Sequence, residues 1–385
     1  MKTIVTISGG GIIGNYISSK LHNHNIDSLV IEKLSKSNQV KENIRTLTLN
    51  QASKKLLDEI GVNVNYAEIK KIFVNDGEGS GKINFSSDEI GSDNLSYVVF
   101  FNDLQQALQQ KTLERTIFEN EIKKIISGEP SKNSEVTLSN NQSILTKFVA
   151  GCDGRNSKVA KIGKFKEINN TYNQTAATFT VTVNNLEETS AYQIFSEKGI
   201  FAIMPAPKSS GKLTHTVVWS IDNKRLKDTD IESYVIDNIN YFENKLGTKI
   251  KIFSKILSFN LINHHYQSYV SDSMVLIGDA AHSIHPLAGQ GINLGFADAQ
   301  VLCEEIIRGF ERSHEPDQKL ILKKYEIKRR SLNLAMLKSM DLFVNTFNSN
   351  NLYTKLIRNI GLSSVNKINF LKRLFINHAA GNNKI

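Results

Sequence analysis

The chain has 385 residues, of which 40% are hydrophobic, and it contains five prolines, 23 glycines and two cysteines. This length provides for two domains, and the composition excludes a collagen-like chain, a low-complexity chain and a disulfide scaffold. The formal net charge of +9 comes from the C-terminal end, because residues 319–385 contain 13 Lys and Arg against two Asp and Glu. The residues before this segment contain 34 basic and 36 acidic side chains.

The start of the chain predicts a cytoplasmic protein. Residues 4–7 form a short apolar run that ends at once in glycines, whereas a secretory signal has a longer apolar segment and a small-residue cleavage site. No apolar run approaches the roughly 18 residues that a membrane-spanning helix needs. The absence of paired cysteines fits a reducing compartment.

The first 32 residues predict the beginning of a βαβ unit. Residues 3–8 indicate a strand, a glycine turn follows, a helical stretch reaches about residue 21, and residues 27–32 indicate a second strand. The sequence therefore places a glycine turn at the carboxyl end of the first strand, where nucleotides bind in such folds.

Three glycines in this turn have the spacing of a dinucleotide-binding motif. Gly9 allows the tight turn, Gly11 lets a pyrophosphate approach the backbone, and Gly14 lets the helix pack closely on the strand. The helix N-terminus offers N–H groups and a positive dipole end to the phosphates. Glu32 lies 18 residues after Gly14, where its carboxylate can accept hydrogen bonds from an adenosine ribose. A glycine turn that serves packing alone does not account for Glu32.

The middle of the chain predicts a β-rich region bounded by helices. Its expected elements are, in order, a helix over 50–60, short strands over 69–74 and 82–85, a helix capped by Asn102 or Asp103 and extending through Leu113, antiparallel strands within 175–221, a helix over 231–246 and a strand over 250–260.

A second turn motif follows the short strand expected over residues 148–150. Asp153 and Gly154 favour a tight turn. If this strand lies next to the first strand of the chain, the turn lies beside Gly9. The alternative is an ordinary hairpin turn.

A third motif, downstream, distinguishes FAD from NAD. Residues 273–277 indicate a buried strand that ends at Gly278 and Asp279, and a carboxylate there can hold a ribityl hydroxyl of a flavin. The Pro-x-x-Gly-x-Gly turn at 286–291 opens a helix expected over 292–308. The N–H groups of this helix can face the pyrimidine side of an isoalloxazine. An NAD enzyme has no need of this second cradle.

The order of these elements predicts an α/β fold. We expect a discontinuous Rossmann-like FAD-binding domain and an antiparallel β-sheet substrate domain, followed by C-terminal helices. The predicted FAD-binding domain comprises 1–68, 96–167 and 262–335; the predicted substrate domain comprises 69–95 and 168–261; and the predicted helical tail is 336–385. Within the tail, residues 367–378 are amphipathic and basic, which is typical both of an interfacial helix and of a helix packed on the body of the protein.

The three motifs, in this order and spacing, resemble those of the class A flavoprotein monooxygenases, which have the fold of p-hydroxybenzoate hydroxylase. The stretch HPLAGQGINLGFAD, from His285 to Asp298, resembles more specifically that of the ubiquinone-biosynthesis hydroxylases, which act on polyprenylated phenols. Stretches within 95–108 and 191–220 also fit that subfamily. The resemblance extends over nearly the whole chain and is strongest at the flavin motifs.

The resemblance implies a set of FAD contacts. These are the pyrophosphate at Gly9, Gly11 and Gly14; the adenosine ribose at Glu32; the flavin vicinity at Arg45; FAD and NADPH at Asp153 and Gly154; the ribityl chain at Gly278 and Asp279; and the flavin ring at Pro286, Gly289, Gln290, Gly291, Ile292 and Asn293. Family members often have an arginine where this chain has Asn102, so one FAD contact of the family is not assured here. We expect no metal site, because nothing completes a zinc site around the HxxH pair His282 and His285.

By the same resemblance, NADPH or NADH reduces FAD, and the reduced flavin activates O2 for attack by an electron-rich phenol ring. The implied partners are a lipophilic phenol, O2 and a ubiquinone-biosynthesis complex, with no nucleic acid. The basic C-terminal tail suggests peripheral contact with the inner face of a membrane, or a solvated face. The sequence identifies no catalytic acid or base.

Three other functions stay open on the sequence alone. The first is another FAD oxidoreductase of the superfamily, such as a prenyl-chain reductase or a hydroxylase of a soluble aromatic acid. The second is a non-catalytic paralogue that supports a biosynthetic complex. The third is an NAD dehydrogenase, which the second glycine cradle disfavours.

Overall fold

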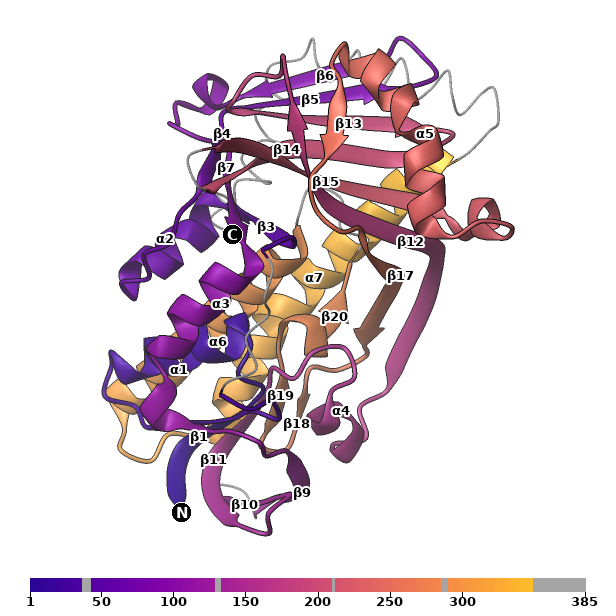
Figure 1. The fold of residues 1–385 in the computed structure, drawn as a ribbon. Helices are drawn as coiled ribbons and strands as arrows, with labels where there is room; N and C mark the ends of the chain where they lie inside the picture. The colour runs from indigo at the N-terminus through magenta and orange to yellow at the C-terminus, as the bar shows by residue number, and fades with distance from the viewer. Residues whose placement is uncertain (37–42, 129–132, 210–211, 285–289, 349–385) are drawn as a thin grey trace.

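The computed structural model describes residues 1–36, 43–128, 133–209, 212–284 and 290–348. These residues form three β-sheets with helices packed around them (Figure 1). A mainly parallel sheet with α1, α3 and α6 occupies the lower part of the view, and a large, mainly antiparallel sheet covered by α5 occupies the upper part.

The lower sheet begins with the predicted βαβ unit. Its strands follow the order β18-β19-β11-β1-β2-β8, and the contiguous strands β19, β11, β1, β2 and β8 are parallel. The bounds are β1 Lys2–Ser8, β2 Ser28–Ile31, β8 Thr116–Ile117, β11 Ser143–Gly151, β18 Val270–Ser271 and β19 Met274–Leu276, with β9 Ile122–Ile126 and β10 Ser134–Leu138 added antiparallel beside β11. The strand before Asp153 is thus the direct neighbour of β1, which confirms the parallel arrangement over the hairpin alternative.

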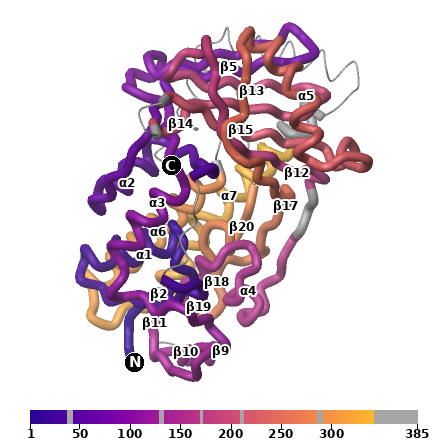
Figure 2. The backbone as a smooth tube through the Cα atoms, in the orientation of Figure 1, coloured from indigo at the N-terminus to yellow at the C-terminus, as the bar shows by residue number. Residues whose placement is uncertain are grey.

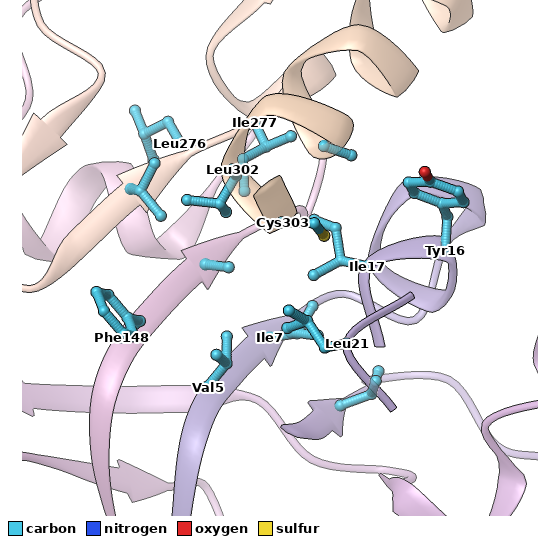
Figure 3. Close-up of a cluster of buried hydrophobic side chains, with 14 of the residues drawn as sticks. Val5, Ile7, Tyr16, Ile17, Leu21, Phe148, Leu276, Ile277, Leu302 and Cys303 are labelled. Atoms are coloured by element: carbon cyan, nitrogen blue, oxygen red, sulfur yellow. The ribbon is translucent and has the colours of Figure 1, made fainter. Parts of the chain in front are cut away.

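The core of the lower part lies between this sheet and two helices, α1 (Ile12–His22) and α6 (Gln290–Arg312) (Figure 3). Val5 and Ile7 of β1 are fully buried. Opposing them are Ile17 and Leu21 of α1, and Leu302 and Cys303 of α6, all also fully buried. This apolar contact fixes the first glycine turn relative to the sheet, because that turn connects β1 directly to α1.

The upper sheet has nine strands in the order β20-β17-β12-β15-β14-β13-β5-β6, with β16 beside β12. All pairs are antiparallel except β13 with β5. The bounds are β5 Lys71–Asp76, β6 Lys82–Ser86, β12 Glu167–Val183, β13 Ser190–Ser196, β14 Gly199–Ser209, β15 Lys212–Asp222, β16 Ile250–Ile252, β17 Leu257–Tyr266 and β20 His282–Ser283.

One face of the upper sheet packs under α5 (Ile231–Leu246). Trp219 is fully buried there against Phe201 and Phe242. Trp219 is therefore a core residue of the sheet and does not line a substrate cavity.

A small sheet joins the two parts. It consists of β3 (Thr46–Asn50), β7 (Ser96–Phe100) and β4 (Ala67–Ile69), followed in the chain by α2 (Gln51–Glu59) after β3 and α3 (Phe101–Gln110) after β7. The Thr46 hydroxyl lies 3.1 Å from that of Thr216, and the Thr48 hydroxyl lies 3.4 Å from the sulfur of Met204. Strand β3 thus touches the face of the upper sheet opposite α5.

The C-terminal helix α7 (Gln318–Asn348) bridges the two large sheets (Figure 2). At its lower end the Tyr325 hydroxyl donates to the Leu276 carbonyl at 2.8 Å. At its upper end Asp341 accepts hydrogen bonds from Tyr172 and Asn263 at 2.7 and 2.8 Å. In the part of the chain that the structure describes, none of the helices has the run of apolar residues that a bilayer crossing requires.

Most predicted elements are present, with shifts at their ends. The predicted cap of α3 by Asn102 or Asp103 is wrong: the helix begins at Phe101, its N-cap residue is Phe100, and it ends at Gln110. The reason is that β7 runs directly into α3 without a polar turn. The domain boundaries stay a prediction, and residues 349–385, including the amphipathic segment 367–378, lie outside the described residues.

Candidate active site

The first glycine turn has the geometry of a phosphate cradle. Gly9 has a φ of +99°, and a Cβ atom there would lie 2.6 Å from the Cys152 carbonyl oxygen. A Cβ atom at Gly14 would lie 2.0 Å from the Gly9 carbonyl oxygen, so neither position accepts a side chain. A Cβ atom at Gly11 would meet nothing within 4 Å. The first and third glycines therefore serve packing, while the second faces open space beside the N-terminus of α1.

The N-terminus of α1 is available to a ligand. Its N-cap residue, Gly11, provides no side-chain hydrogen bond to the first turn. The carbonyl of Gly10 is held by the side chains of Asn15 and Gln105 at 2.8 and 2.6 Å. Because the carbonyl is held by these donors, the turn can present N–H groups to an anion.

Glu32 lies where the sequence predicts it, at the end of β2 and beside the glycine turn. Its two carboxylate oxygens accept hydrogen bonds from the backbone N–H of Gly10 at 2.6 Å and of Leu34 at 2.8 Å. Each oxygen keeps a further lone pair, so hydroxyl donors of a ribose can still bind.

The Asp153 turn lies against the first glycine turn. One carboxylate oxygen of Asp153 accepts a hydrogen bond from the Ser8 hydroxyl at 3.1 Å and another from the Lys158 N–H at 2.8 Å, where α4 (Lys158–Ile162) begins. The other oxygen is buried and has no hydrogen-bond partner among the described residues. Gly154 has a φ of +75°. The turn thus places the second carboxylate oxygen of Asp153 next to the first glycine turn, where it can accept a hydrogen bond.

The Gly278–Asp279 turn, called the second flavin turn or the second turn below, carries a carboxylate that interacts electrostatically with Arg45. Gly278 has a φ of +58°, in the left-handed region that favours glycine. Asp279 is accessible to solvent, yet surrounding protein atoms displace enough water to raise the pKa of its carboxyl. His282 and Arg45 oppose this rise because positive charge favours the carboxylate.

Arg45 is held over an aromatic ring at the start of α3. Its guanidinium carbon lies 4.6 Å from the centre of the Phe101 ring, within the range of a cation–π contact. Arg45 is exposed to solvent, yet surrounding protein atoms displace enough water to lower the pKa of its guanidinium, and Asp279 opposes that change. The predicted flavin-proximal arginine and ribityl carboxylate therefore act on each other electrostatically.

The start of α6 contributes backbone and one amide side chain. Gly291 has open space where a Cβ atom would lie, and Ile292 is half-buried. The Asn293 side chain donates to the Thr48 carbonyl at 2.9 Å. Its oxygen accepts a hydrogen bond from the Asn50 N–H, so this side chain binds the backbone of β3. Pro286, Gly289 and the side chain of Gln290 lie outside the described residues.

Behind the second turn lies a buried ionic network that sequence reasoning missed. Asp298 of α6 is fully buried and contacts His282, Arg329 and Asn333. A charged residue on the same helix face as the buried Leu302, four residues further on, is the signal that predicts such a network. His282 is thus engaged with Asp298, while its HxxH partner His285 lies outside the described residues.

These residues fit an FAD molecule. The open turn at Gly11 would accept the pyrophosphate, and Glu32 would accept the adenosine ribose. The accessible carboxylate of Asp279 would accept the ribityl chain. When bound, FAD supplies the redox chemistry that amino-acid side chains lack.

Comparisons with known proteins agree with this site. Residues 2–339 match the family described as "FAD binding domain". Among curated proteins, the chain is 27% identical to the 3-demethoxyubiquinol 3-hydroxylase of Escherichia coli, with 98% of both chains covered. It is 26% identical to a mitochondrial ubiquinone biosynthesis monooxygenase of Dictyostelium discoideum, over 98% of this chain and 91% of that protein.

Two solved structures show the same fold. The p-nitrophenol 4-monooxygenase of Pseudomonas putida has a TM-score of 0.79 at 16% identity, with both chains fully covered. The protein HpxO of Klebsiella pneumoniae, solved with FAD and uric acid, has a TM-score of 0.75 at 16% identity, over 98% of this chain and 96% of that one.

The chain belongs to the FAD binding domain family, and its fold is that of p-hydroxybenzoate hydroxylase. It is an FAD-dependent monooxygenase, related in sequence to the hydroxylases of ubiquinone biosynthesis. The predicted cofactor, fold and enzyme class are thereby confirmed. The roles of individual site residues stay predictions.

Proposed function

We propose that this monooxygenase hydroxylates the aromatic ring of a polyprenylated phenol in ubiquinone biosynthesis, with O2 and with NADPH or NADH as electron donor. The observation that carries the proposal is the uncharged surface of the upper sheet on the side of the flavin turns. Ala202, Val218 and Gln193 are adjacent across three strands, and Met204 lies next along β14. All four are half-buried and thus partly accessible.

This surface lies beside the elements that hold the flavin turns. Met204 touches Thr48, and Asn293 at the start of α6 binds the carbonyl of the same Thr48. A ring bound on the uncharged surface would therefore lie near the second turn. A soluble aromatic acid needs a cation for its carboxylate, whereas a neutral phenol with an apolar tail needs a surface of this kind.

The full-length similarity to curated ubiquinone-biosynthesis enzymes also supports the proposal. In this function the chain's own residues orient and shield the substrate. The glycine turn and Glu32 would bind the nucleotide part of FAD, Asp279 would hold its ribityl chain, and the uncharged surface would place the ring and exclude water.

The test is deletion of the gene followed by profiling of quinone intermediates. We expect a prenylated phenol that lacks one hydroxyl group to accumulate, and the intact gene to remove it. Val218→Lys places a charge on the uncharged surface and should fail to restore the quinone while the purified protein stays yellow. Ile236→Lys, at an exposed position of α5, is the matched control and should restore it. Unchanged quinone pools in the deletion would refute the substrate assignment.

A second experiment separates hydroxylation from the other functions. Purified enzyme with its reductant should convert the accumulated phenol only when oxygen is present. Anaerobic mixing with NADPH and with NADH identifies the donor from the rate at which the flavin absorbance is lost. Conversion without oxygen would indicate a reductase, and a protein that takes up no FAD would indicate a non-catalytic paralogue.

The same function places the enzyme in the cytoplasm at the inner face of the membrane, where prenylated phenols dissolve. The excess of 13 basic over two acidic side chains in residues 319–385 supports peripheral contact with anionic lipid. Co-flotation with vesicles of phosphatidylglycerol, lost in high salt and absent with phosphatidylcholine, is the expected result. Membership of a ubiquinone-biosynthesis complex would appear as co-purification of the pathway's other enzymes.

A further inference from the structure

Asp298 is the centre of a network that joins the second flavin turn, Gly278–Asp279, to helix α7. One carboxylate oxygen accepts a hydrogen bond from the Gly278 N–H at 3.2 Å and another from His282 Nε2 at 2.6 Å. The other oxygen accepts from Arg329 Nε at 2.7 Å and from Asn333 Nδ2 at 2.9 Å. Because a carboxylate only accepts, His282 Nε2 is the donor in its pair.

The network is sealed from water. Asp298 and Asn333 are fully buried, His282 is 2% exposed and Arg329 is 8% exposed. Burial disfavours the charged carboxylate, but His282 and Arg329 hold the pKa of Asp298 well below its usual range. Removing one partner of such a pair leaves a buried charge without compensation, which is strongly unfavourable.

The network is placed to act on the turn that precedes α6. Gly278 donates directly to Asp298, and the next residue is Asp279, the predicted ribityl ligand. His282 also opposes the rise in the pKa of the Asp279 carboxyl. Neither Asp298 nor Arg329 belongs to the predicted FAD contacts, so both act through the turn.

We propose that Asp298, His282 and Arg329 are positioning residues for FAD. They fix the Gly278–Asp279 turn and make retention of the cofactor depend on the docking of α7, which supplies Arg329 and Asn333. Docking of α7 should affect only the binding of the ribityl and flavin end of the cofactor. The reason is that, within the described residues, the side chains of the network make no hydrogen bond to the first glycine turn.

The test compares two ligands in a set of variants. FAD uses both turns, whereas ADP has the pyrophosphate and the adenosine ribose but no ribityl chain. In Asp298→Asn and Arg329→Met we expect the Kd for FAD to rise at least tenfold, and the Kd for ADP to change less than twofold. Arg329→Lys keeps the charge and should recover most of the FAD affinity.

Lys328→Met is the matched control. Lys328 is adjacent to Arg329 and also joins α7 to α6, through an ion pair with Glu305 at 2.6 Å, but it does not touch the network. Its Kd for FAD should stay within twofold of the wild-type value. If Lys328→Met weakens FAD as much as Arg329→Met does, general helix docking explains the effect and the proposal is wrong.

A milder variant keeps the test decisive if the charge variants do not fold. Asn333→Ala removes one neutral donor to Asp298 and leaves both charges in place. We expect a smaller rise in the FAD Kd, again without a change for ADP. Equal loss of FAD and ADP affinity, or an unchanged FAD affinity in all network variants, would overturn the proposal.

Discussion

The side-chain oxygen of Asn293 accepts a hydrogen bond from the backbone N–H of Asn50 at 2.9 Å, across 243 residues of sequence. The same side chain donates to the Thr48 carbonyl at 2.9 Å. Asn50 also caps α2, since its side chain accepts from the Ser53 N–H at 2.8 Å. Asn293 therefore connects the start of α6 to the junction between β3 and α2.

We expect Asn293→Ala to lower the stability of the FAD-free protein. The substitution leaves a buried N–H and a carbonyl without partners, which costs about 1–3 kcal/mol for such a group. A lower denaturation midpoint, measured without FAD, checks this. Asn238→Ala in α5 is the control, because its amide binds only the Tyr234 carbonyl of the same helix. Equal midpoints for the two variants would contradict the anchoring role.

Alanine substitutions at Gly14 and Gly11 in the first turn should differ in their effects on protein stability and on FAD affinity. Gly14→Ala drives a Cβ atom into the Gly9 carbonyl oxygen and should lower both the thermal stability of the FAD-free protein and the affinity for FAD. Gly11→Ala meets no protein atom, so its FAD-free stability should equal that of the wild type, while FAD affinity falls at least tenfold. Calorimetry and FAD titration separate the two; a destabilised Gly11→Ala protein would contradict the open cradle.

Glu32 and Asp279 should affect different ends of the cofactor. Glu32→Ala removes a charged acceptor of the ribose, and hydrogen bonds to charged groups contribute about 1.5–3 kcal/mol. The affinities for FAD and for ADP should fall together, by roughly tenfold or more. Asp279→Asn should weaken FAD and leave ADP unchanged. The reverse pattern would mean that the two carboxylates have been assigned to the wrong ends.

His215 predicts a specific loss of stability in mild acid. Both ring nitrogens are buried and have no hydrogen-bond partner within the described part of the chain. Burial lowers the pKa of His215 to about 4, against about 6.5 for an unfolded chain. The unfolded state therefore binds more protons between these values, and stability falls as the pH decreases from about 7 toward 4. At pH 5 the loss from this residue is about 2 kcal/mol.

Replacing His215 by phenylalanine should remove that part of the acid sensitivity. The denaturation midpoint of His215→Phe is expected to change less between pH 8 and pH 5 than that of the wild type. His264, whose pKa burial also lowers to about 4, keeps a residual slope in the variant. His314→Gln, at an exposed position, should behave as the wild type does. Parallel pH profiles for His215→Phe and the wild type would refute the prediction.

The backbone of the site was predictable because its motifs are local. Gly9 to Gly14, Glu32 and Gly278–Asp279 follow strands whose positions depend on apolar runs of adjacent residues. Side chains that act across the fold were not predictable in the same way. Arg329 meets Asp298 only because α7 packs on α6, and no spacing within either helix specifies that contact.

One error has a physical reason. The expected cap of α3 assumed a polar turn before the helix, but Phe100 ends a strand that continues into Phe101. The place of Asn293 beside the flavin ring stays a prediction; the structure adds that its side chain binds backbone groups of Thr48 and Asn50 in β3. A resemblance locates a residue in the site without specifying its partners.

Helix α7 is hydrogen-bonded to both large sheets, the lower, mainly parallel half of the molecule and the upper, mainly antiparallel half. It is attached through Tyr325 at one half and Asp341 at the other, which are about 24 Å apart along a helix. A helix cannot be stretched without breaking its backbone hydrogen bonds, so we expect α7 to oppose any lengthening of the distance between its two attachment points. We therefore expect a bulky substrate to enter by rearrangement of connecting segments and not by a wide hinge opening.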